Sequence, residues 1–310
     1  IYVRAEYPIA VEHINMAIGQ ARELGLLGEG IGGTDFNFDI DVRIGAGAFV
    51  CGEETALIAS LEGKRGMPIP RPPFPAQKGY FEKPTNINNV ETWANVPLII
   101  KNGAEWYGQV GTEESKGTKI FSLAGKVNNT GLVEVPIGST VKDVIYEIGG
   151  GIPKGRAFKA VQMGGPAGGC VPPQFLSLQI DYDTVQRIGA IMGSGGMVVM
   201  DENNCMVEIA RFFLSFTQSE SCGKCAPCRL GTTQLLDILT RITQGKGRMA
   251  DIDTIRQLGE TLTEASLCGL GQACSKPALS TLKYFLKEFE DHIKEHRCAG
   301  AVCDLSLIHI

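Results

Sequence analysis

Apolar positions recur along this chain with two different periods, one typical of helices and one typical of strands, and the changes from one period to the other divide the chain into parts. Residues 8–27 place apolar side chains three and four apart, which predicts a helix that begins at its proline. Residues 36–44 alternate apolar with polar side chains, which predicts a strand leading into a glycine-rich turn and a helix near Glu53. The Pro-rich residues 67–75 exclude a helix, and an apolar helix is expected around 93–101.

A strand–strand–helix–strand pattern follows between residues 118 and 166, and it predicts a small β-grasp-like module. Its strands are expected at 119–124, 132–136 and 158–163, and its helix at 141–148. After residue 202 the apolar positions recur with the helical period. Four segments carry an apolar stripe and predict a four-helix bundle: 204–217, 229–244, 252–265 and 277–296.

These patterns predict a multidomain chain of the α/β and α+β classes. The expected parts are an α/β domain at 1–112, the β-grasp module at 113–170, a connection returning to the first domain at 171–202, the helical bundle at 203–297 and a truncated linker at 298–310. The chain begins with Ile1, and residues 306–310 continue no earlier pattern, which suggests a fragment cut at both ends and leaves open whether the tail is native. The longest apolar stretch, 188–200, holds four glycines and is shorter than the roughly 20 residues that a membrane helix needs.

Composition narrows the class of protein further. With 310 residues and 44% hydrophobic content, the chain is large enough for two or three domains. The net charge of -5 comes without a basic block, which argues against a nucleic-acid partner. Ten cysteines without a signal peptide indicate a reducing, cytoplasmic location and metal ligation rather than disulfides. Cys51, Cys170 and Cys205 stand singly and are expected to be small buried hydrophobic residues.

The remaining chemistry is concentrated in Cys222, Cys225 and Cys228, with Cys268 forty residues further on. Three cysteines at a repeat of three cannot all point one way on a long helix or strand, but they suit a tight loop around one small object. A cubane iron–sulfur cluster is such an object, because it takes four thiolates. A disulfide pair and a zinc knuckle are the alternatives, although zinc sites usually draw on two separate pairs of ligands. The helix that starts at the triplet, with Lys224 and Arg229, would offset the negative charge of a cluster.

Three further stretches are weaker signals. The glycine-rich turn at 45–55 suits a phosphate or flavin edge, but such turns also serve as plain tight packing. The loop 71–75 either borders a site or is a rigid spacer. The amide side chains of 86–92 either cap a helix or hydrogen-bond an aromatic ring system.

Taken together, these motifs resemble the family of NADH-binding flavoprotein subunits shared by respiratory complex I (its F-type component) and soluble NAD(P)-linked, electron-bifurcating [FeFe]-hydrogenases (their beta-type component). The resemblance rests on Gly45–Thr55, Arg71–Pro75, Asn86–Thr92 and Glu220–Gly231, and it covers nearly the whole chain. The family pattern usually has tyrosine and isoleucine where this chain has Phe49 and Val50. A family loop rich in glycine that holds the FMN phosphate and NADH would precede residue 1.

The resemblance implies roles for individual residues. It implies an FMN-binding α/β domain, a β-grasp domain of the SLBB type and a helical bundle that carries a [4Fe-4S] cluster. The residues that match FMN contacts are Gly52, Glu53, Asn88, Asn89 and Thr92, and those that match NADH contacts are Glu54 and Phe74. The cluster ligands would be Cys222, Cys225, Cys228 and Cys268.

The implied activity is that of an NAD(P)H dehydrogenase, or diaphorase, subunit. NADH passes a hydride to FMN, single electrons go on to the cluster, and no side chain is assigned as catalytic. The implied partners are a small thioredoxin-like [2Fe-2S] subunit and an Fe–S subunit of a hydrogenase or of complex I. The stretches 164–170 and 296–303 favour a soluble hydrogenase complex, with NADH-quinone oxidoreductase as the alternative. The sequence does not distinguish NADH from NADPH, the direction of electron flow or bifurcation.

Two other readings remain open at this stage. Cys274, His292, Cys298 and Cys303 are a candidate zinc site, because three thiolates and an imidazole suit tetrahedral zinc. The alternative is that Cys274 is a core residue and the other three face solvent. A zinc-only interaction module and a flavin-free electron relay are the rival functions from other classes.

Overall fold

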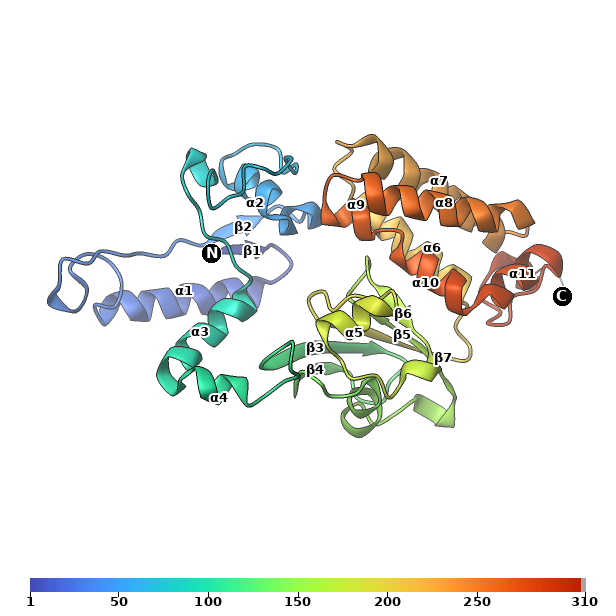
Figure 1. Ribbon diagram of the computed structural model, residues 1–310, viewed down its shortest axis with the longest axis horizontal. Coiled ribbons are helices and arrows are strands. Elements are labelled where there is room, and N and C mark those ends of the chain that lie inside the picture. Colours follow the sequence, from blue (N-terminus) through green and yellow to red (C-terminus); the bar gives the residue numbers. More distant parts are fainter. Residues whose placement is uncertain (308–310) are drawn as a thin grey trace. The chain divides into compact units, whose positions relative to one another are not determined.

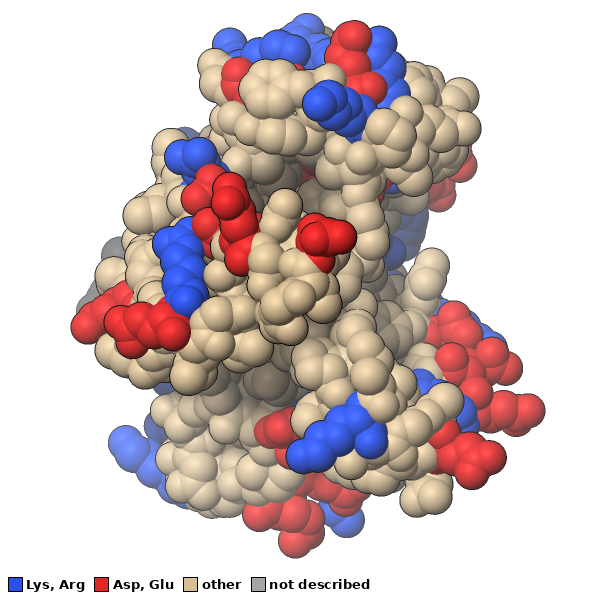
Figure 2. Space-filling model, turned by 90° about the vertical axis from the view of Figure 1, so that its left-hand side faces the viewer, with Lys and Arg blue, Asp and Glu red and all other residues tan. Residues whose placement is uncertain are grey.

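The computed structural model describes residues 1–307, which form two compact units, 1–87 and the chain from residue 88 onward (Figure 1). The division falls well before the expected boundary at 112/113, because the helix at 90–102 belongs to the second unit. Among the described residues, no helix is both long and apolar enough to cross a membrane. On the face shown in Figure 2, basic and acidic side chains lie in small neighbouring groups among uncharged residues.

The first unit is built on a pair of short parallel strands, β1 (Tyr2–Arg4) and β2 (Arg43–Gly45). Between them lies α1 (Pro8–Glu23), which starts at the predicted proline, and α2 (Glu54–Leu61) follows β2. Short 3₁₀ turns occupy Ile31–Gly33, Phe49–Gly52 and Tyr80–Glu82. The strand predicted at 36–44 is wrong over most of its length: only its end pairs with β1, and Phe38 makes one isolated bridge to Gly28.

The second unit contains a five-stranded sheet in the order β4-β3-β7-β5-β6. Its strands are β3 (Thr118–Gly125), β4 (Gly131–Pro136), β5 (Phe158–Met163), β6 (Gly169–Val171) and β7 (Gly196–Asp201). The first two form an antiparallel hairpin, β7 runs parallel to β3 and antiparallel to β5, and β6 pairs with β5. The core on this sheet includes Phe121, Val161, Met197 and Val199, all nearly inaccessible to solvent.

The stretch 171–202 is therefore not a connection returning to the first domain. It contributes α5 (Tyr182–Arg187) and β7, and β7 is the central strand of the β-grasp sheet. Gly125 ends β3 beside this strand with a φ of 87°, and a Cβ there would lie 2.3 Å from the carbonyl oxygen of Val199. The helix expected at 141–148 is a π-helical segment, Asp143–Ile148.

The longer helices of the second unit come before and after this sheet in the chain. The helices α3 (Val90–Asn102) and α4 (Ala104–Gly108) precede it, and the bundle that follows it is coloured from golden yellow through orange to red in Figure 1. The bundle consists of α6 (Met206–Ser219), α7 (Ala226–Thr243), α8 (Met249–Ala265), α9 (Gly269–Ala273), α10 (Lys276–Tyr284) and α11 (Leu286–Lys294). A final 3₁₀ turn spans Asp304–Leu307. The last three residues of the suspected tail lie outside the described residues.

The helix predicted at 277–296 is in fact two helices. They meet at Phe285, whose backbone leaves the helical region with φ -130° and ψ 35°. The side chain of Phe285 packs with Tyr284 against Cys170 and Met200 of the sheet, so the break joins the bundle to the β-grasp module. The bundle keeps its own core around Leu214, Leu239, Ile255 and Phe289.

Candidate functional site

Three of the four cysteines of the predicted cluster lie at the starts of helices, and the fourth lies in the loop just before one of them. Cys222 lies in the loop after α6, Cys225 is the N-cap residue of α7, and Cys228 lies in the first turn of α7. Cys268 is the N-cap residue of the short helix α9. Each of Cys228 and Cys268 is electrostatically affected by other thiols of the set, so the structure brings together residues that are forty positions apart in sequence.

A network of short contacts shapes the loop that carries these thiols. Gly223, with a φ of 73°, turns the chain between the first two cysteines, and its N–H donates to Ser221 Oγ at 3.3 Å. Ser221 Oγ lies 3.3 Å from Cys228 Sγ, and the Arg229 guanidinium donates to the Gly223 carbonyl at 2.5 Å. A Cβ on Gly271 would meet Cys228 Cβ at 3.2 Å, so glycine is needed where α9 approaches α7.

The donor set fits a [4Fe-4S] cluster. Burial raises the pKa of Cys228, a hydrogen bond with Ser221 lowers it, and the neighbouring thiols raise it again. Burial also raises the pKa of Cys268. Such a crowd of thiols favours a cationic centre that holds them as thiolates, and helix N-termini favour negative charge in the same place.

Cys274 lies beside this cluster loop and not in the predicted zinc site. Its Sγ donates to the Gly271 carbonyl at 3.0 Å, its side chain is fully buried, and burial raises the pKa of its thiol to about 12. The expectation that Cys274 joins His292 is therefore wrong, because the end of α9 holds it under the cluster loop.

Cys205 takes the place expected for Cys274. The ligand atoms of Cys205, His292, Cys298 and Cys303 all lie within 4.8 Å of one another, and all four residues are buried. His292 Nε2 lies 3.4 Å from the sulfurs of Cys205 and Cys303, which are 3.7 Å apart. The alternative that His292, Cys298 and Cys303 face solvent is wrong.

The surroundings of this group orient its ligands. His292 Nδ1 donates to the Glu288 carbonyl at 2.6 Å, which leaves Nε2 free to act as a ligand. The Glu288 carboxylate accepts from the Met206 N–H at 2.9 Å and pairs with Lys159 at 2.7 Å. A Cβ on Gly300 would lie 2.6 Å from the Asn203 carbonyl, so glycine allows the loop 298–303 to reach the start of α6.

The two residues matched to NADH contacts line one cavity of the first unit. This cavity of about 480 Å³ is bordered by Glu54, Phe74, Pro75, Ala76, Pro84, Thr85, Asn86 and Ile87. Glu54 opens α2, and its carboxylate receives the Arg71 guanidinium at 2.6 Å. Arg71 also lies over the ring of Phe74, 5.8 Å from its centroid, so the loop 71–75 borders a cavity and is not only a spacer.

The residues matched to FMN contacts belong to both units. In the first, Gly52 is exposed with open space around its Cβ position, and Glu53 caps α2 by accepting from the N–H groups of Thr55 and Ala56 at 2.9 Å. In the second, Asn88, Asn89 and Thr92 are exposed at the start of α3, where Asn89 Oδ1 accepts from the Glu91 N–H at 2.8 Å. Exposed amide and hydroxyl groups at a helix start suit hydrogen bonds to a flavin.

A buried ion pair holds the start of α3 against the sheet. Lys119 Nζ lies 2.5 Å from Glu91 Oε2, and the other carboxylate oxygen accepts from the Ile120 N–H at 3.2 Å. The lysine side chain is 4% exposed and the glutamate side chain 31%. The segment with Asn88, Asn89 and Thr92 is thereby fixed to β3.

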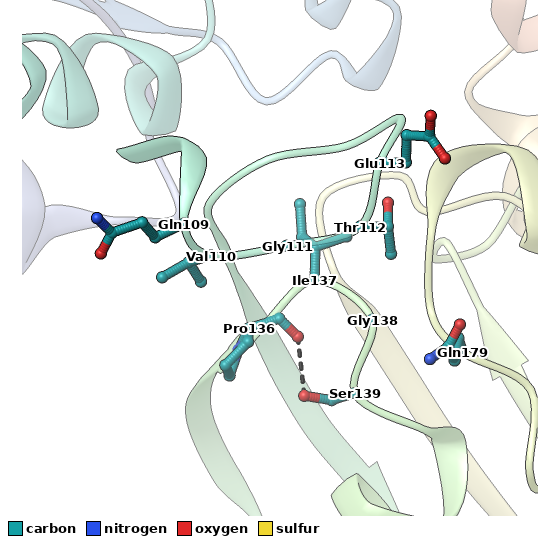
Figure 3. A pocket seen from close by; sticks show the side chains of 10 residues that line it. All are labelled: Gln109, Val110, Gly111, Thr112, Glu113, Pro136, Ile137, Gly138, Ser139 and Gln179. Atoms are coloured by element: carbon teal, nitrogen blue, oxygen red, sulfur yellow. Dashed lines mark hydrogen bonds between the residues drawn. The ribbon is translucent and has the colours of Figure 1, made fainter. Parts of the chain in front are cut away.

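A second cavity lies elsewhere in the second unit, between the loop 109–113 and the end of β4 (Figure 3). Its volume is about 610 Å³, and Ser139 Oγ at its edge donates to the Pro136 carbonyl at 2.8 Å. None of the residues matched to FMN, NADH or the cluster lines it, so it is separate from the candidate site.

Sequence reasoning missed Cys205, Arg71, Glu91 and Lys119. Cys205 lies 87 residues from His292, and a single cysteine gives no sign of so distant a partner. Arg71 could have been found, because a basic residue three positions before Phe74, which the resemblance matches to an NADH contact, is a local signal.

Comparisons with known proteins agree with this arrangement along the chain. Family models match at residues 1–98 (Nuo51 FMN-binding domain), 120–171 (SLBB domain) and 208–292 (NADH-ubiquinone oxidoreductase-F iron-sulfur binding region). The NADP-reducing hydrogenase subunit HndC of Solidesulfovibrio fructosivorans is 56% identical over 309 residues, which are 100% of this chain and 63% of that protein. The F 2 subunit of the NADH-quinone oxidoreductase of Rhizobium meliloti (strain 1021) is 41% identical over 298 residues, covering 96% of this chain and 71% of that protein.

A solved structure shares the fold. An NAD+-reducing [NiFe]-hydrogenase in the H2-reduced state superposes with a TM-score of 0.83 at 33% identity, over 96% of this chain and 49% of that chain. The present chain thus spans 63% of the length of HndC and about half of the hydrogenase chain.

Proposed function

Because the chain belongs to the family of NADH-binding flavoprotein subunits of NADH-quinone oxidoreductases and hydrogenases, we propose that it is the electron-input part of an NAD(P)-linked hydrogenase complex. The alternative is the corresponding subunit of NADH-quinone oxidoreductase. The identity of 56% to a hydrogenase subunit, against 41% to an oxidoreductase subunit, favours the first.

The observation that carries the proposal is the convergence of Cys222, Cys225, Cys228 and Cys268 at two helix starts, inside the stretch that matches the iron–sulfur model. Bound FMN would supply the exchange between a hydride and single electrons. The chain's own residues would bind and orient these groups. Glu54 and Phe74 border the cavity proposed for the dinucleotide, and the four cysteine thiols would hold the cluster.

Iron analysis under anaerobic conditions tests the cluster. The protein should bind about four iron and four sulfide per chain. Cys225→Ser should lose most of that iron, whereas Cys170→Ser, which alters a buried cysteine of the sheet, should keep it. A protein that binds zinc at the four thiols and remains colourless would contradict the proposal.

A second test addresses the electron-input activity. The complete protein, expressed with whatever precedes residue 1 and loaded with FMN, should reduce a dye with NADH. Cys225→Ser, which should lose most of the cluster, should leave binding of the dinucleotide unchanged and stop electrons from passing beyond FMN. Failure of the FMN-loaded protein to oxidise NADH would favour a flavin-free relay.

The choice between hydrogenase and oxidoreductase membership can be tested on the coding sequence. Reading it in frame beyond Asp304 should reveal further Cys-x-x-Cys-x-x-Cys repeats if the protein serves a hydrogenase. An early stop codon would favour the oxidoreductase. The partners we propose are a small thioredoxin-like [2Fe-2S] subunit and an Fe–S subunit of the complex, and the cytoplasmic location predicted from the sequence belongs to the same proposal.

We also propose that Cys205, His292, Cys298 and Cys303 hold one zinc ion. Three thiolates and one imidazole within 4.8 Å suit tetrahedral zinc, and the Glu288 carbonyl fixes the tautomer of His292. Metal analysis should find about one zinc per chain beside the iron. Cys205→Ser should lose the zinc and keep the iron, whereas Cys274→Ala should keep the zinc. Absence of zinc from the intact protein would end this proposal.

A further inference from the structure

We propose that the hydroxyl groups of Ser221 and Ser266 donate hydrogen bonds to sulfur atoms of the cluster and thereby raise its reduction potential. The inference rests on the proposed function, because it takes the four cysteines as the ligands of a [4Fe-4S] cluster. It goes further by naming two residues that are not ligands and that set how readily the cluster accepts an electron.

The contacts of Ser221 are the first support. Its Oγ lies 3.3 Å from Cys228 Sγ and accepts the N–H of Gly223, also at 3.3 Å. A thiolate that holds iron carries no proton, so the hydroxyl must be the donor in its contact with Cys228. The N–H of Gly223 takes up a lone pair of the same hydroxyl and leaves its proton for the sulfur. Arg229 holds this turn by donating to the Gly223 carbonyl at 2.5 Å.

The surroundings of Ser266 are a second, independent support. Ser266 is 5% exposed, and its Oγ has no hydrogen-bond partner among the residues that the structure describes. Such a buried hydroxyl is costly and rare in folded proteins. Ser266 precedes Cys268 by two residues, and a Cβ on Gly271 would lie 2.8 Å from Ser266 Oγ and 3.2 Å from Cys228 Cβ. The unpartnered hydroxyl therefore lies beside two of the four ligands, where bound sulfide or thiolate would supply the missing acceptor.

The direction of the effect follows from charge. Reduction adds one electron to the cluster, and hydrogen bonds to a more negative acceptor are stronger. A donated hydrogen bond therefore stabilises the reduced form more than the oxidised form and raises the potential. Serine carries no charge, so its hydroxyl acts through hydrogen bonding alone. A higher potential makes the cluster a better acceptor for electrons that enter through the flavin.

A redox titration followed by electron paramagnetic resonance tests the inference on the complete, FMN-loaded protein. Ser221→Ala and Ser266→Ala should each keep the iron and lower the ratio of reduced to oxidised cluster about tenfold at a fixed potential. For a one-electron couple, this change lowers the midpoint potential by about 59 mV. Ser221→Thr and Ser266→Thr keep the hydroxyl and should keep the midpoint of the unaltered protein. The midpoint of the flavin should not move in any of these variants.

Two other serines of the bundle provide matched controls. Ser219 is exposed at the end of α6, and its hydroxyl donates to the Phe216 carbonyl at 2.8 Å. Ser280 is 4% exposed, and its hydroxyl donates to the Lys276 carbonyl at 2.7 Å. Because both hydroxyls donate within their own helices, Ser219→Ala and Ser280→Ala should leave the midpoint of the cluster unchanged.

A second measurement decides the matter if the alanine variants lose their iron. In D2O, pulsed electron paramagnetic resonance of the unaltered, reduced protein should detect exchangeable deuterons coupled to the cluster. The inference is overturned if no deuteron is coupled, if the alanine variants keep both the iron and the midpoint, or if the threonine variants shift as far as the alanine variants. An unaltered protein that binds zinc and no iron at the four thiols would instead refute the proposed cluster, and the inference would fail with it.

Discussion

The ion pair between Lys119 and Glu91 predicts how much stability is lost when either partner is replaced. The two losses should differ, because the lysine side chain is more deeply buried than the glutamate side chain. Replacing Glu91 by glutamine leaves an ammonium group, 4% exposed, without a counter-charge, so that its remaining acceptors are neutral: the amide oxygen of the new glutamine and the Ile120 carbonyl at 3.3 Å. Replacing Lys119 by methionine leaves a carboxylate that is 31% exposed and can still be hydrated.

The two changes should therefore differ in cost. Breaking a buried pair by removing one partner typically costs about 3–5 kcal/mol, and the partial access of water to this pair places Glu91→Gln near the lower limit, at about 3 kcal/mol. Lys119→Met should cost about 1 kcal/mol, because the stranded charge stays in contact with water. The double variant, Glu91→Gln with Lys119→Met, should lose about as much stability as Lys119→Met alone, because it has no buried ammonium group without a counter-charge.

Hydrogen exchange followed by mass spectrometry measures this locally. Exchange of the peptide that covers β3 should accelerate about 150-fold in Glu91→Gln if 3 kcal/mol is lost, and about fivefold in Lys119→Met. Peptides of α1, which belongs to the other unit, serve as the internal control and should not change. Equal acceleration in the two single variants, or none in Glu91→Gln, would refute the reasoning from burial.

Three further predictions concern stability and reactivity of the second unit. Phe289 is fully buried, so Phe289→Ala should cost about 3–5 kcal/mol in thermal unfolding, whereas the exposed Phe212→Ala should cost about 1 kcal/mol or less; equal costs would contradict this. Burial would raise the pKa of Asp181, but hydrogen bonds from Thr112 and the Asp183 N–H lower it below 3.8, so its stabilisation is complete above pH 4 and is lost as the pH falls through the folded value. Asp181→Ala should therefore cost about 1 kcal/mol at pH 7 and progressively less below pH 4 in melting curves, and a constant difference would contradict the assignment. Burial raises the pKa of Cys170 to about 12, so iodoacetamide at pH 8 should alkylate Cys170 only after denaturation, and rapid labelling of the folded protein would contradict the structure.

What the sequence could predict was local. The helix 8–23, the strand pair 118–125 and 131–136, and the cysteine triplet at a helix start follow from periodicity or spacing over a few residues. The central strand 196–201 could not be predicted in the same way, because its apolar run 197–200 lacks alternation and its partner Ser122 lies 74 positions earlier, opposite Gly196. The candidate zinc site could not be predicted completely for the same reason. Cys205 and Cys303 are far apart in the sequence, and they come together only in the folded bundle.

The central position of β7 has a consequence for synthesis on the ribosome. The hairpin of β3 and β4 and the pair of β5 and β6 each leave an edge unpaired until residues 196–201 leave the exit tunnel. A nascent chain that stops at residue 171, where the matched SLBB segment ends, would expose two strand edges of the kind that promote aggregation. Any excised version of this module must therefore extend through Asp201 to close its sheet.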